Sequence, residues 1–421
     1  MSASHDCFAH DHALLALSDA IALLQTRLGP VCQTEDLSVS EALGRVVAVD
    51  VVAQVTVPPH DNSAMDGYAY RAADIQPGQA TVPVARRIAA GDPPGAPLDA
   101  GTAIRIFTGA PMPPDGDTVA MQEDCQTSVG PNGETLVTLP THQKTGANRR
   151  LAGEDVAAGT VVLPAGRRLR GPDLAMAASV GHRTLTVYRP LKVALFSTGN
   201  ELKAPGEALE PGQIYDSNRF GVAGCLQMLG CAVTDLGSLP DNAERITAAL
   251  ELAARDHQLV VTSGGVSMGD EDHVKKAIER IGTLHFWRLA VKPGRPLALG
   301  SLGDTVFLGL PGNPVAALVS LMLIGRAVIH RLQGRTATPM RRYRLPSAFA
   351  FSKKAGRQEF IRCWLEDDAS GQVSVQRFAS QGSGVLSSMV KADGLVDVTI
   401  DTTEVRPGDL VDFLPFAEAL W

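Results

Sequence analysis

The sequence predicts a multidomain α/β plus β protein that is built around a central doubly wound α/β/α domain. The chain has 421 residues, which is more than one hydrophobic core usually holds. From residue 190 to residue 338, short apolar runs alternate with helical patterns, which favours a mainly parallel sheet with helices on both faces. Residues 57–153 and 339–421 show short runs of β-forming residues between turns, which predicts two smaller β-rich units.

The N-terminal part predicts a helical framework into which a β-rich module is inserted. Apolar residues recur at helical spacing up to Leu28, and Gly29-Pro30 ends that helix. A second, shorter helix is expected around residues 40–47, and a helical pattern returns near residue 171. The expected units are therefore a discontinuous framework of residues 8–56 and 154–189, and an inserted β-rich module of residues 57–153.

The α/β segment should carry a ligand site at one edge of its sheet. Apolar runs such as Val193–Phe196 and Leu259–Val261 are followed by helical patterns. Right-handed crossovers place the carboxyl ends of parallel strands at one edge, where such sheets bind ligands. The loops expected at this edge comprise residues 197–201, 240–241 and 263–272. Residues 339–421 then follow as a small C-terminal β-barrel-like domain.

Composition excludes several classes of partner. The net charge of −7 provides no large basic field for nucleic acid or an anionic membrane. The six cysteines include no CxxC pair, which is typical of a reduced compartment. The N-terminus shows no signal-peptide pattern, and the apolar run Val315–Ile324 is too short to span a bilayer. We therefore expect a cytoplasmic protein.

A glycine-containing turn at residues 262–272, TSGGVSMGDED, predicts a phosphate site. It lies between an apolar strand and a helical pattern, a geometry that aims backbone N–H groups at an anion. Its acids, Asp270, Glu271 and Asp272, would repel a phosphate unless a divalent cation bridged them, so Mg²⁺ is expected as well. The substrate-binding candidates in this turn are Ser263, Gly264, Gly265, Ser267 and Gly269.

Other acids follow neighbouring strands of the same segment. Glu201 and Asp241 should meet Asp272 at the shared edge. Each has a structural alternative when taken alone: Asp241 could cap a helix, and Asp272 could interact with a helix dipole. Because they converge on one edge, Glu201, Asp241 and Asp272 are predicted as metal ligands.

Cationic residues and a proline-rich turn complete the expected anion site. In the run from Arg288 to Pro296, an extended strand would place Arg288 and Lys292 on one face, although a solvated strand end is the alternative. The turn at residues 310–314 precedes the helical pattern 315–332 and could deliver N–H groups to an anion. The substrate-binding candidates here are Arg288, Arg295, Pro311 and Pro314.

Short strings along the whole chain resemble one family. DNSAMDGYA, RIFTGAPMP, AGEDV, ALFSTGNEL, GQIYDSN, TSGGVSMGDED, FWRLAVKPGRP, LGLPGNPVAA and QGSGVLSSM occur in the order found in the molybdopterin molybdenumtransferase family, which includes bacterial MoeA and the E domain of gephyrin. The resemblance implies a molybdopterin-binding α/β domain and a Mg²⁺-dependent enzyme of molybdenum cofactor biosynthesis. Its substrates would be molybdate and adenylylated molybdopterin, and it would release AMP and molybdenum cofactor.

The resemblance also implies roles for individual residues. Arg362 and Ser383, in the C-terminal domain, would bind molybdate. The catalytic residues would be Asp66, Thr108, Asp155, Asp241, Asp272 and Lys292. Two positions depart from the family, because Asn200 stands where an acid is frequent and Arg288 stands where Lys is frequent. These departures leave the roles of Asn200 and Arg288 open.

The resemblance further implies a homodimer with sites shared between subunits. The molybdopterin adenylyltransferase and molybdoenzyme chaperones would be its protein partners. Two alternatives are a molybdopterin adenylyltransferase, which shares the α/β fold but lacks the flanking β modules, and a gephyrin-like scaffold protein. The set of acidic residues favours an enzyme over a scaffold protein. The sequence also shows no fused domain of the kind that a gephyrin-like scaffold has.

Overall fold

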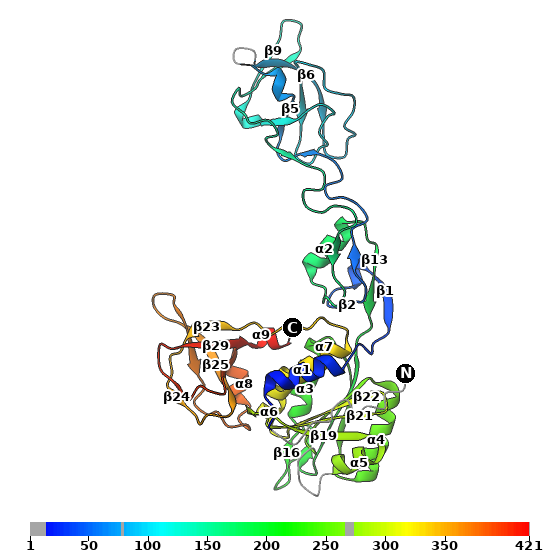
Figure 1. Cartoon of the computed structure of the whole chain (residues 1–421), viewed down its shortest axis with the longest axis vertical. Coiled ribbons are helices and arrows are strands. Elements are labelled where there is room, and N and C mark those ends of the chain that lie inside the picture. The colour runs from blue at the N-terminus through cyan, green and yellow to red at the C-terminus, as the bar shows by residue number, and fades with distance from the viewer. Residues whose placement is uncertain (1–13, 77–79, 266–272, 421) are drawn as a thin grey trace.

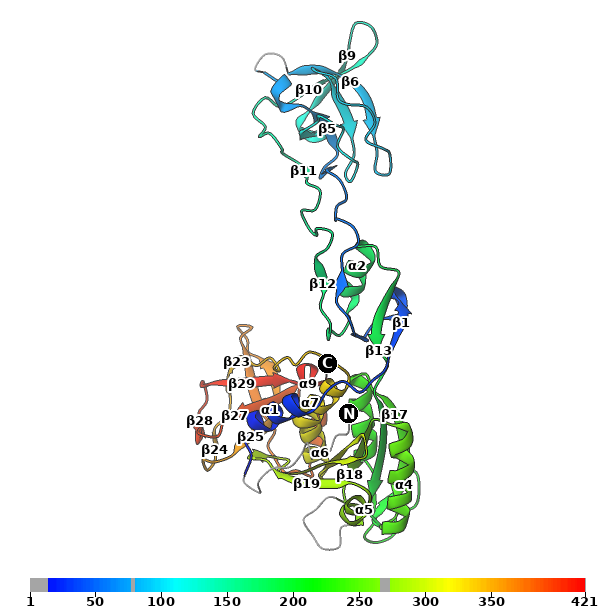
Figure 2. The same ribbon diagram turned by 45° about the vertical axis from the view of Figure 1, so that its right-hand side comes forward.

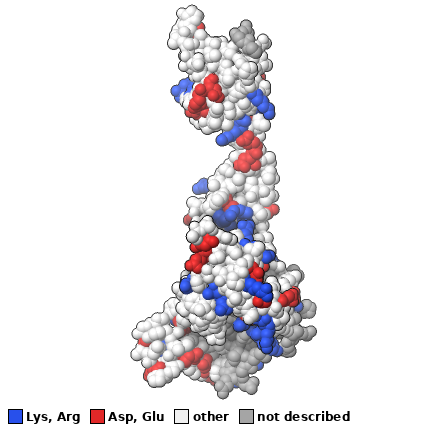
Figure 3. Space-filling model, turned by 90° about the vertical axis from the view of Figure 1, so that its left-hand side faces the viewer, with Lys and Arg blue, Asp and Glu red and all other residues white. Residues whose placement is uncertain are grey.

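The computed structural model describes residues 14–76, 80–265 and 273–420. The molecule is elongated (Figures 1 and 2). A β-rich module lies at one end and a small mixed unit in the middle. The α/β domain and the C-terminal β domain lie side by side at the other end. Acidic and basic side chains are interspersed along the face in Figure 3, in keeping with the modest net charge.

The α/β domain contains a six-stranded sheet in the order β17-β14-β18-β22-β21-β19. The first four strands are parallel, and β21 and β19 add an antiparallel edge. The strands are β14 (Lys192–Thr198), β17 (Ala232–Leu239), β18 (Leu259–Ser263), β19 (Thr283–Arg288), β21 (Pro296–Leu302) and β22 (Thr305–Leu310). A short parallel pair, β15 (Leu202–Lys203) and β16 (Ile214–Tyr215), lies beside the sheet.

Helices cover both faces of this sheet, as the sequence predicts. Val193 and Leu195 of β14 pack in one core, whereas Ala194 and Phe196 pack in the other. This alternation buries both faces of the strand. The helices are α3 (Asn218–Met228), α4 (Ala243–Asp256), α5 (His273–Ile281), α6 (Pro314–Ser320) and α7 (Arg326–Leu332), and a π-helical turn at Leu321–Gly325 joins the last two.

The helix from Pro314 to Leu332 is long and apolar enough to span a membrane, but 83% of its apolar window is buried inside the protein. It is therefore a core helix of the α/β domain. The first helix, α1 (Leu17–Arg27), packs against α7, and its buried Leu24 belongs to the same core. The apolar spacing in the sequence predicted this helix correctly. The sequence assigned the helix to the framework of residues 8–56 and 154–189, whereas α7, against which it packs, belongs to the α/β domain.

The middle unit is organised by a sheet rather than by helices alone. Its three strands lie in the order β1-β13-β2, and one helix packs beside them. The segment expected as a helix at residues 40–47 is instead a 3-10 turn, Val39–Glu41, followed by β2 (Val46–Val47), so that expectation was wrong. Its β-branched valines pair with β13. The other elements are β1 (Thr34–Ser38), α2 (Gly171–Ser179) and β13 (Thr184–Tyr188).

The inserted module is β-rich, as expected, and is connected to the middle unit by the paired strands β3 (Val51–Val52) and β12 (Val161–Leu163). Its main sheet has the order β8-β5-β7-β6-β10-β9. These strands are β5 (Gly67–Tyr70), β6 (Thr81–Ile88), β7 (Ala103–Ile106), β8 (Thr118–Met121), β9 (Gln126–Val129) and β10 (Thr135–Thr138). β4 (Asn62–Ser63) pairs with β11 (Arg149–Arg150).

The C-terminal domain is a sheet in the order β20-β25-β27-β29-β23, with β26 paired to β25. Its first strand, β20 (Val291–Lys292), comes from the segment that follows β19. A segment of the α/β part of the chain therefore contributes a strand to the C-terminal sheet. The remaining elements are β23 (Tyr343–Pro346), β24 (Phe351–Ser352), β25 (Gln358–Asp367), β26 (Val373–Arg377), α8 (Ser387–Lys391), β27 (Gly394–Val398), β28 (Glu404–Val405), β29 (Leu410–Pro415) and α9 (Phe416–Leu420).

Candidate active site

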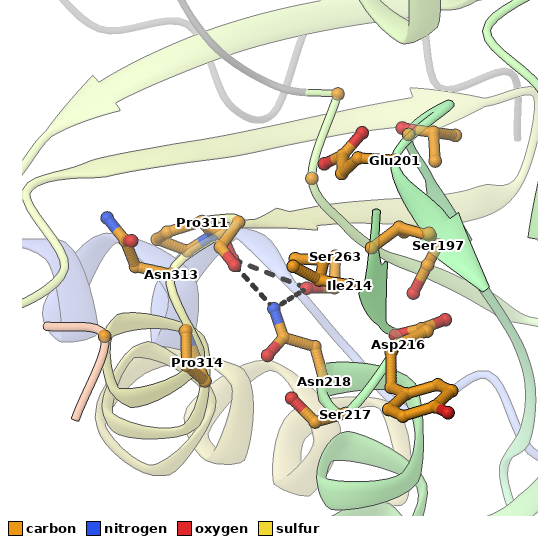
Figure 4. A pocket seen from close by; sticks show the side chains of 18 of the residues that line it. Ser197, Glu201, Ile214, Asp216, Ser217, Asn218, Ser263, Pro311, Asn313 and Pro314 are labelled. Atoms are coloured by element: carbon orange, nitrogen blue, oxygen red, sulfur yellow. Dashed lines mark hydrogen bonds between the residues drawn. The ribbon is translucent and has the colours of Figure 1, made fainter. Parts of the chain in front are cut away.

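A cleft of about 680 Å³ lies at the carboxyl ends of the parallel strands (Figure 4). The loops after β14, β17, β18 and β22 line it, together with the segment before α3 and Gly384 of the C-terminal domain. The predicted edge is thus a cleft with a volume typical of small-molecule sites. It brings together the predicted residues Glu201, Asp241, Ser263, Gly264, Gly265, Pro311 and Pro314.

The glycine turn after β18 requires its glycines. Gly264 and Gly265 have φ angles of +88° and +65°. A Cβ atom on Gly265 would lie 2.5 Å from Cγ2 of Val274 and would also overlap the hydroxyl of Thr198. The Gly264 N–H donates to the Leu310 carbonyl at 3.2 Å, which holds the turn against the end of β22. The backbone of this turn can therefore lie this close to Thr198 and Val274 only because its glycines carry no side chains.

The proline turn between β22 and α6 offers fewer donors than expected. Pro311 and Pro314 carry no N–H, and the Val315 N–H donates to the Ser383 carbonyl at 3.0 Å. This bond brings the loop that contains Ser383 and Gly384 to the cleft from the C-terminal domain. The turn thus contributes its rigid shape and its link to Ser383.

Acidic side chains enter the cleft from the loops after β14 and β17. Asp241 Oδ2 accepts from the Asn200 N–H at 3.2 Å, and Asn200 Oδ1 accepts from the Asp241 N–H at 3.3 Å. Asn200, the departure from the family pattern, therefore joins the two loops reciprocally. Glu201 is exposed in the same cleft.

The end of β14 supplies two buried hydroxyls to this cleft. Ser197 Oγ and Thr198 Oγ1 have no hydrogen-bond partner among the described residues. Buried hydroxyls are normally paired, so these two oxygens are unsatisfied polar groups in the wall of the cleft. Together with Glu201 and Asp241 they form an oxygen-rich group of side chains.

The donor set fits a hard cation that is bound jointly with a substrate. Mg²⁺ prefers oxygen ligands and commonly takes one or two carboxylates together with substrate phosphates. Glu201 and Asp241 provide two such carboxylates beside the glycine turn. No group of three or more His, Cys, Asp or Glu side chains converges within the described residues. Three predicted residues, Ser267, Gly269 and Asp272, lie outside the described residues.

Three predicted catalytic residues lie away from this cleft. Asp66 and Thr108 are in the β-rich module, at the end of the molecule opposite to the α/β domain (Figures 1 and 2). The exposed Asp155 follows that module in the sequence. Asp66 Oδ1 accepts from the Thr108 N–H at 2.8 Å and from its hydroxyl at 2.7 Å. These bonds, the backbone one first, lower the pKa of Asp66. One chain therefore does not bring all the predicted residues together.

The predicted cationic strand is divided between two sheets. Arg288 ends β19 in the α/β sheet, whereas Lys292 lies in β20 of the C-terminal sheet. The expectation that they share one strand face was wrong, because Leu289 and Ala290 leave the sheet and bond to Arg295 and Leu15. The Lys292 ammonium pairs with Glu359 Oε2 at 3.2 Å. The side chains of Arg288 and Arg295 are exposed.

Arg362 is buried and contacts the loop that carries Ser383. Its side chain is 1% exposed and donates to Ser388 Oγ at 3.1 Å and to the Gly382 carbonyl at 2.9 Å. Burial lowers the pKa of its guanidinium. In this arrangement Arg362 stabilises the Ser383 loop beside the cleft.

Besides Ser197 and Thr198, the cleft contains other polar residues that were not among the predicted site residues, notably Asp216 and Asn218. Asp216 is 1% exposed and accepts from Arg219 Nε at 3.1 Å and Ser238 Oγ at 2.9 Å. Asn218 donates to two of the cleft turns (Figure 4). The string GQIYDSN contains both residues, but no role was assigned to either of them from the sequence.

The chain matches family models along most of its length. Residues 15–181 match the MoeA N-terminal region (domains I and II). Residues 194–331 match a probable molybdopterin binding domain, and residues 344–416 match the MoeA C-terminal region (domain IV). The matched regions follow the same order as the structural units.

Known relatives agree. A molybdopterin molybdenumtransferase of Haemophilus influenzae is 39% identical over 413 residues, which is 97% of this chain and 100% of the relative. Molybdopterin molybdenumtransferase 2 of Mycobacterium tuberculosis is 35% identical over 90% of this chain and 94% of its own length. The structure of the MoeA protein of Pyrococcus horikoshii superposes with a TM-score of 0.78 at 28% identity, covering 96% of this chain and 100% of that one. This chain belongs to the MoeA family of molybdopterin molybdenumtransferases.

Proposed function

We propose that this protein inserts molybdenum from molybdate into adenylylated molybdopterin in a Mg²⁺-dependent reaction that releases AMP and molybdenum cofactor. The observation that carries the proposal is the cleft at the sheet edge. There a glycine turn lies beside Glu201 and Asp241 and beside the hydroxyls of Ser197 and Thr198, which have no hydrogen-bond partner in the described part of the chain. A phosphoanhydride substrate with a bound cation matches this combination of backbone and oxygen groups.

The glycine turn would receive the phosphates of the adenylylated pterin. Gly264 and Gly265 leave room for close approach, because neither carries a Cβ atom. Glu201 and Asp241 would hold Mg²⁺, with Asp272 as a further ligand. When bound, the cation would neutralise phosphate charge and assist attack on the phosphoanhydride. The Asn200–Asp241 bonds would keep the two acidic loops at a fixed separation.

Molybdate would bind between the C-terminal domain and the cleft. It is a tetrahedral dianion and needs cationic and N–H donors. The Ser383 loop adjoins the cleft, and Arg362 holds that loop at Gly382. In the proposal, Arg362 thus supports the molybdate site by positioning Ser383, and Lys292 supplies charge from β20.

Asp66, Thr108 and Asp155 would act in the cleft of a second subunit. Their distance from the cleft of their own chain supports a homodimer in which the β-rich module of one subunit completes the site of the other. We further propose a cytoplasmic location, with the molybdopterin adenylyltransferase and molybdoenzyme chaperones as protein partners. Matches at residues 15–181 and 344–416 favour this function over the adenylyltransferase alternative.

The test is turnover of purified adenylylated molybdopterin by the full-length protein. AMP and molybdenum cofactor should appear only when molybdate and Mg²⁺ are both present. Chelation should stop the reaction and added Mg²⁺ should restore it. Glu201→Gln should reduce AMP release strongly while leaving thermal stability near that of the wild type, because Glu201 is exposed. Full turnover without Mg²⁺, or by Glu201→Gln, would contradict the metal assignment.

A further inference from the structure

We infer that Asn218 is a positioning residue that sets the separation between the glycine turn and the proline turn of the cleft. Its Nδ2 atom donates to Ser263 Oγ at 2.8 Å and to the Gly312 carbonyl at 2.7 Å (Figure 4). Ser263 ends β18 beside the glycine turn, and Gly312 lies in the proline turn. One amide therefore joins the start of α3 to both turns.

The chemistry of an amide suits this position. Its nitrogen carries two N–H groups, and the two acceptors use both. Ser263, which is 3% exposed, in turn donates to the Pro311 carbonyl at 3.4 Å. An aspartate in place of Asn218 has no N–H and would direct a carboxylate oxygen at the Gly312 carbonyl. The hydroxyl of Ser263 is thus committed to the connection between the turns.

Within residues 80–265 and 273–420, few other hydrogen bonds fix the separation of the two turns at the cleft. The β18–β22 ladder ends at the pair Ser263 and Leu310, after which the Gly264 N–H bonds to the Leu310 carbonyl at 3.2 Å. The start of α3 is itself rigid, because Arg219 and Ser238 hold the buried carboxylate of Asp216. Asn218 therefore links both turns to the start of α3, whose position is fixed by the Asp216 hydrogen bonds.

The kinetic test rests on the proposed function. Asn218→Ala and Asn218→Asp should raise KM for adenylylated molybdopterin about tenfold, on the scale expected when both hydrogen bonds of the Asn218 amide are lost, and should change kcat much less. The double variant with Ser263→Ala should raise KM no further than Asn218→Ala alone, because both residues act through one connection.

The matched control is Gln333→Ala. Gln333 is likewise an amide that donates to a backbone carbonyl, although it is buried whereas Asn218 is half-buried. Its Nε2 donates to the Leu229 carbonyl at 3.0 Å, near the other end of α3. This variant should lose comparable stability without a change in KM. If Asn218→Ala leaves KM within twofold of the wild-type value, or if Gln333→Ala raises KM equally, the positioning role is overturned.

A second measurement does not depend on the reaction. In the substrate-free protein, amide hydrogen exchange at Gly264 should be about tenfold faster in Asn218→Ala than in the wild type. Gln333→Ala should leave this amide unchanged. If the wild type fails to turn over adenylylated molybdopterin, the proposed function fails while exchange at Gly264 still decides whether Asn218 joins the turns. Unchanged exchange in Asn218→Ala would overturn the inference.

Discussion

Asp66 and Thr108 are joined by two hydrogen bonds that end on the same carboxylate oxygen. Oδ1 of Asp66 lies 2.8 Å from the Thr108 backbone nitrogen and 2.7 Å from its hydroxyl oxygen. Thr108 follows β7, whereas Asp66 precedes β5, the neighbouring strand. Thr108 is exposed and Asp66 is half-buried at the surface of the β-rich module. A pair with this geometry is fixed before any substrate arrives.

Thr108→Val should raise the pKa of Asp66, but not all the way back to the ordinary value of an aspartate. The hydroxyl donor is lost, but the backbone N–H, the larger cause of the lowered pKa, remains. Because the folded-state pKa is depressed, this stabilisation is present above the unfolded-state pKa and is lost as the pH falls through the folded-state pKa. The carboxyl signal of ¹³C-aspartate-labelled protein, assigned with Asp66→Asn, gives the pKa directly. An unchanged pKa in Thr108→Val would show that the hydroxyl contributes nothing.

Asp66→Asn and Asp241→Asn should complement each other. Each variant alone should be inactive. If the site is shared, a mixed dimer has one site with both acids intact and one with neither. Random pairing makes about half of the dimers mixed, so roughly a quarter of full activity should return after co-expression.

Two affinity tags, one on each variant, identify the mixed dimers in this experiment. The control mixes wild type with Asp66→Asn. Absence of recovered activity in purified mixed dimers would refute a site shared between subunits.

Gly265→Ala should inactivate the protein and destabilise it by more than the backbone strain alone. Its Cβ atom would overlap Thr198 and Val274. Gly303→Ala is the matched control, because Gly303 has a φ of +63° but open space around it. The control should cost about 1 kcal/mol and retain activity. Activity assays and thermal unfolding of both variants test this, and equal behaviour would show that the close approach at Gly265 is unimportant.

His330 should make the protein less stable at mildly acid pH. It is 3% exposed in α7, and burial, followed by the charges of Arg335 and Arg326, lowers its pKa to about 2. The unfolded state binds a proton below its ordinary pKa near 6.5, whereas the folded state does not. The unfolding free energy contributed by this group should therefore fall by about 2 kcal/mol between pH 7 and pH 5.

The measurement is urea unfolding of wild type and His330→Gln at both pH values. Glutamine keeps an acceptor for Arg335, which lies 3.0 Å from His330 Nε2, but it does not titrate. The variant should lose less stability than the wild type when the pH is lowered. The same loss in both proteins would assign the pH dependence to other groups.

Several parts of the candidate site could be predicted from sequence because parallel strands share an edge. Glu201 and Asp241 follow two different strands and Ser263 ends a third, and all three still meet in one cleft. Asn218 could not be found in this way. Its acceptors lie 45 and 94 residues away, and no local pattern encodes such bonds. The division of Arg288 and Lys292 between two sheets could not be predicted for the same reason. Alternating apolar and basic residues indicate an extended strand, but they do not show with which strand it pairs.

The sequence alone determined which faces of the elements are buried. The alternation of Val193 and Ala194 between two cores follows directly from side chains pointing to opposite faces of a strand. Only the tertiary structure decided the partners of those faces, such as α7 for α1 and β13 for β2. Periodicity records burial, which is a local property of the chain. The choice of partner depends on contacts between segments distant in sequence, and these exist only in the folded protein.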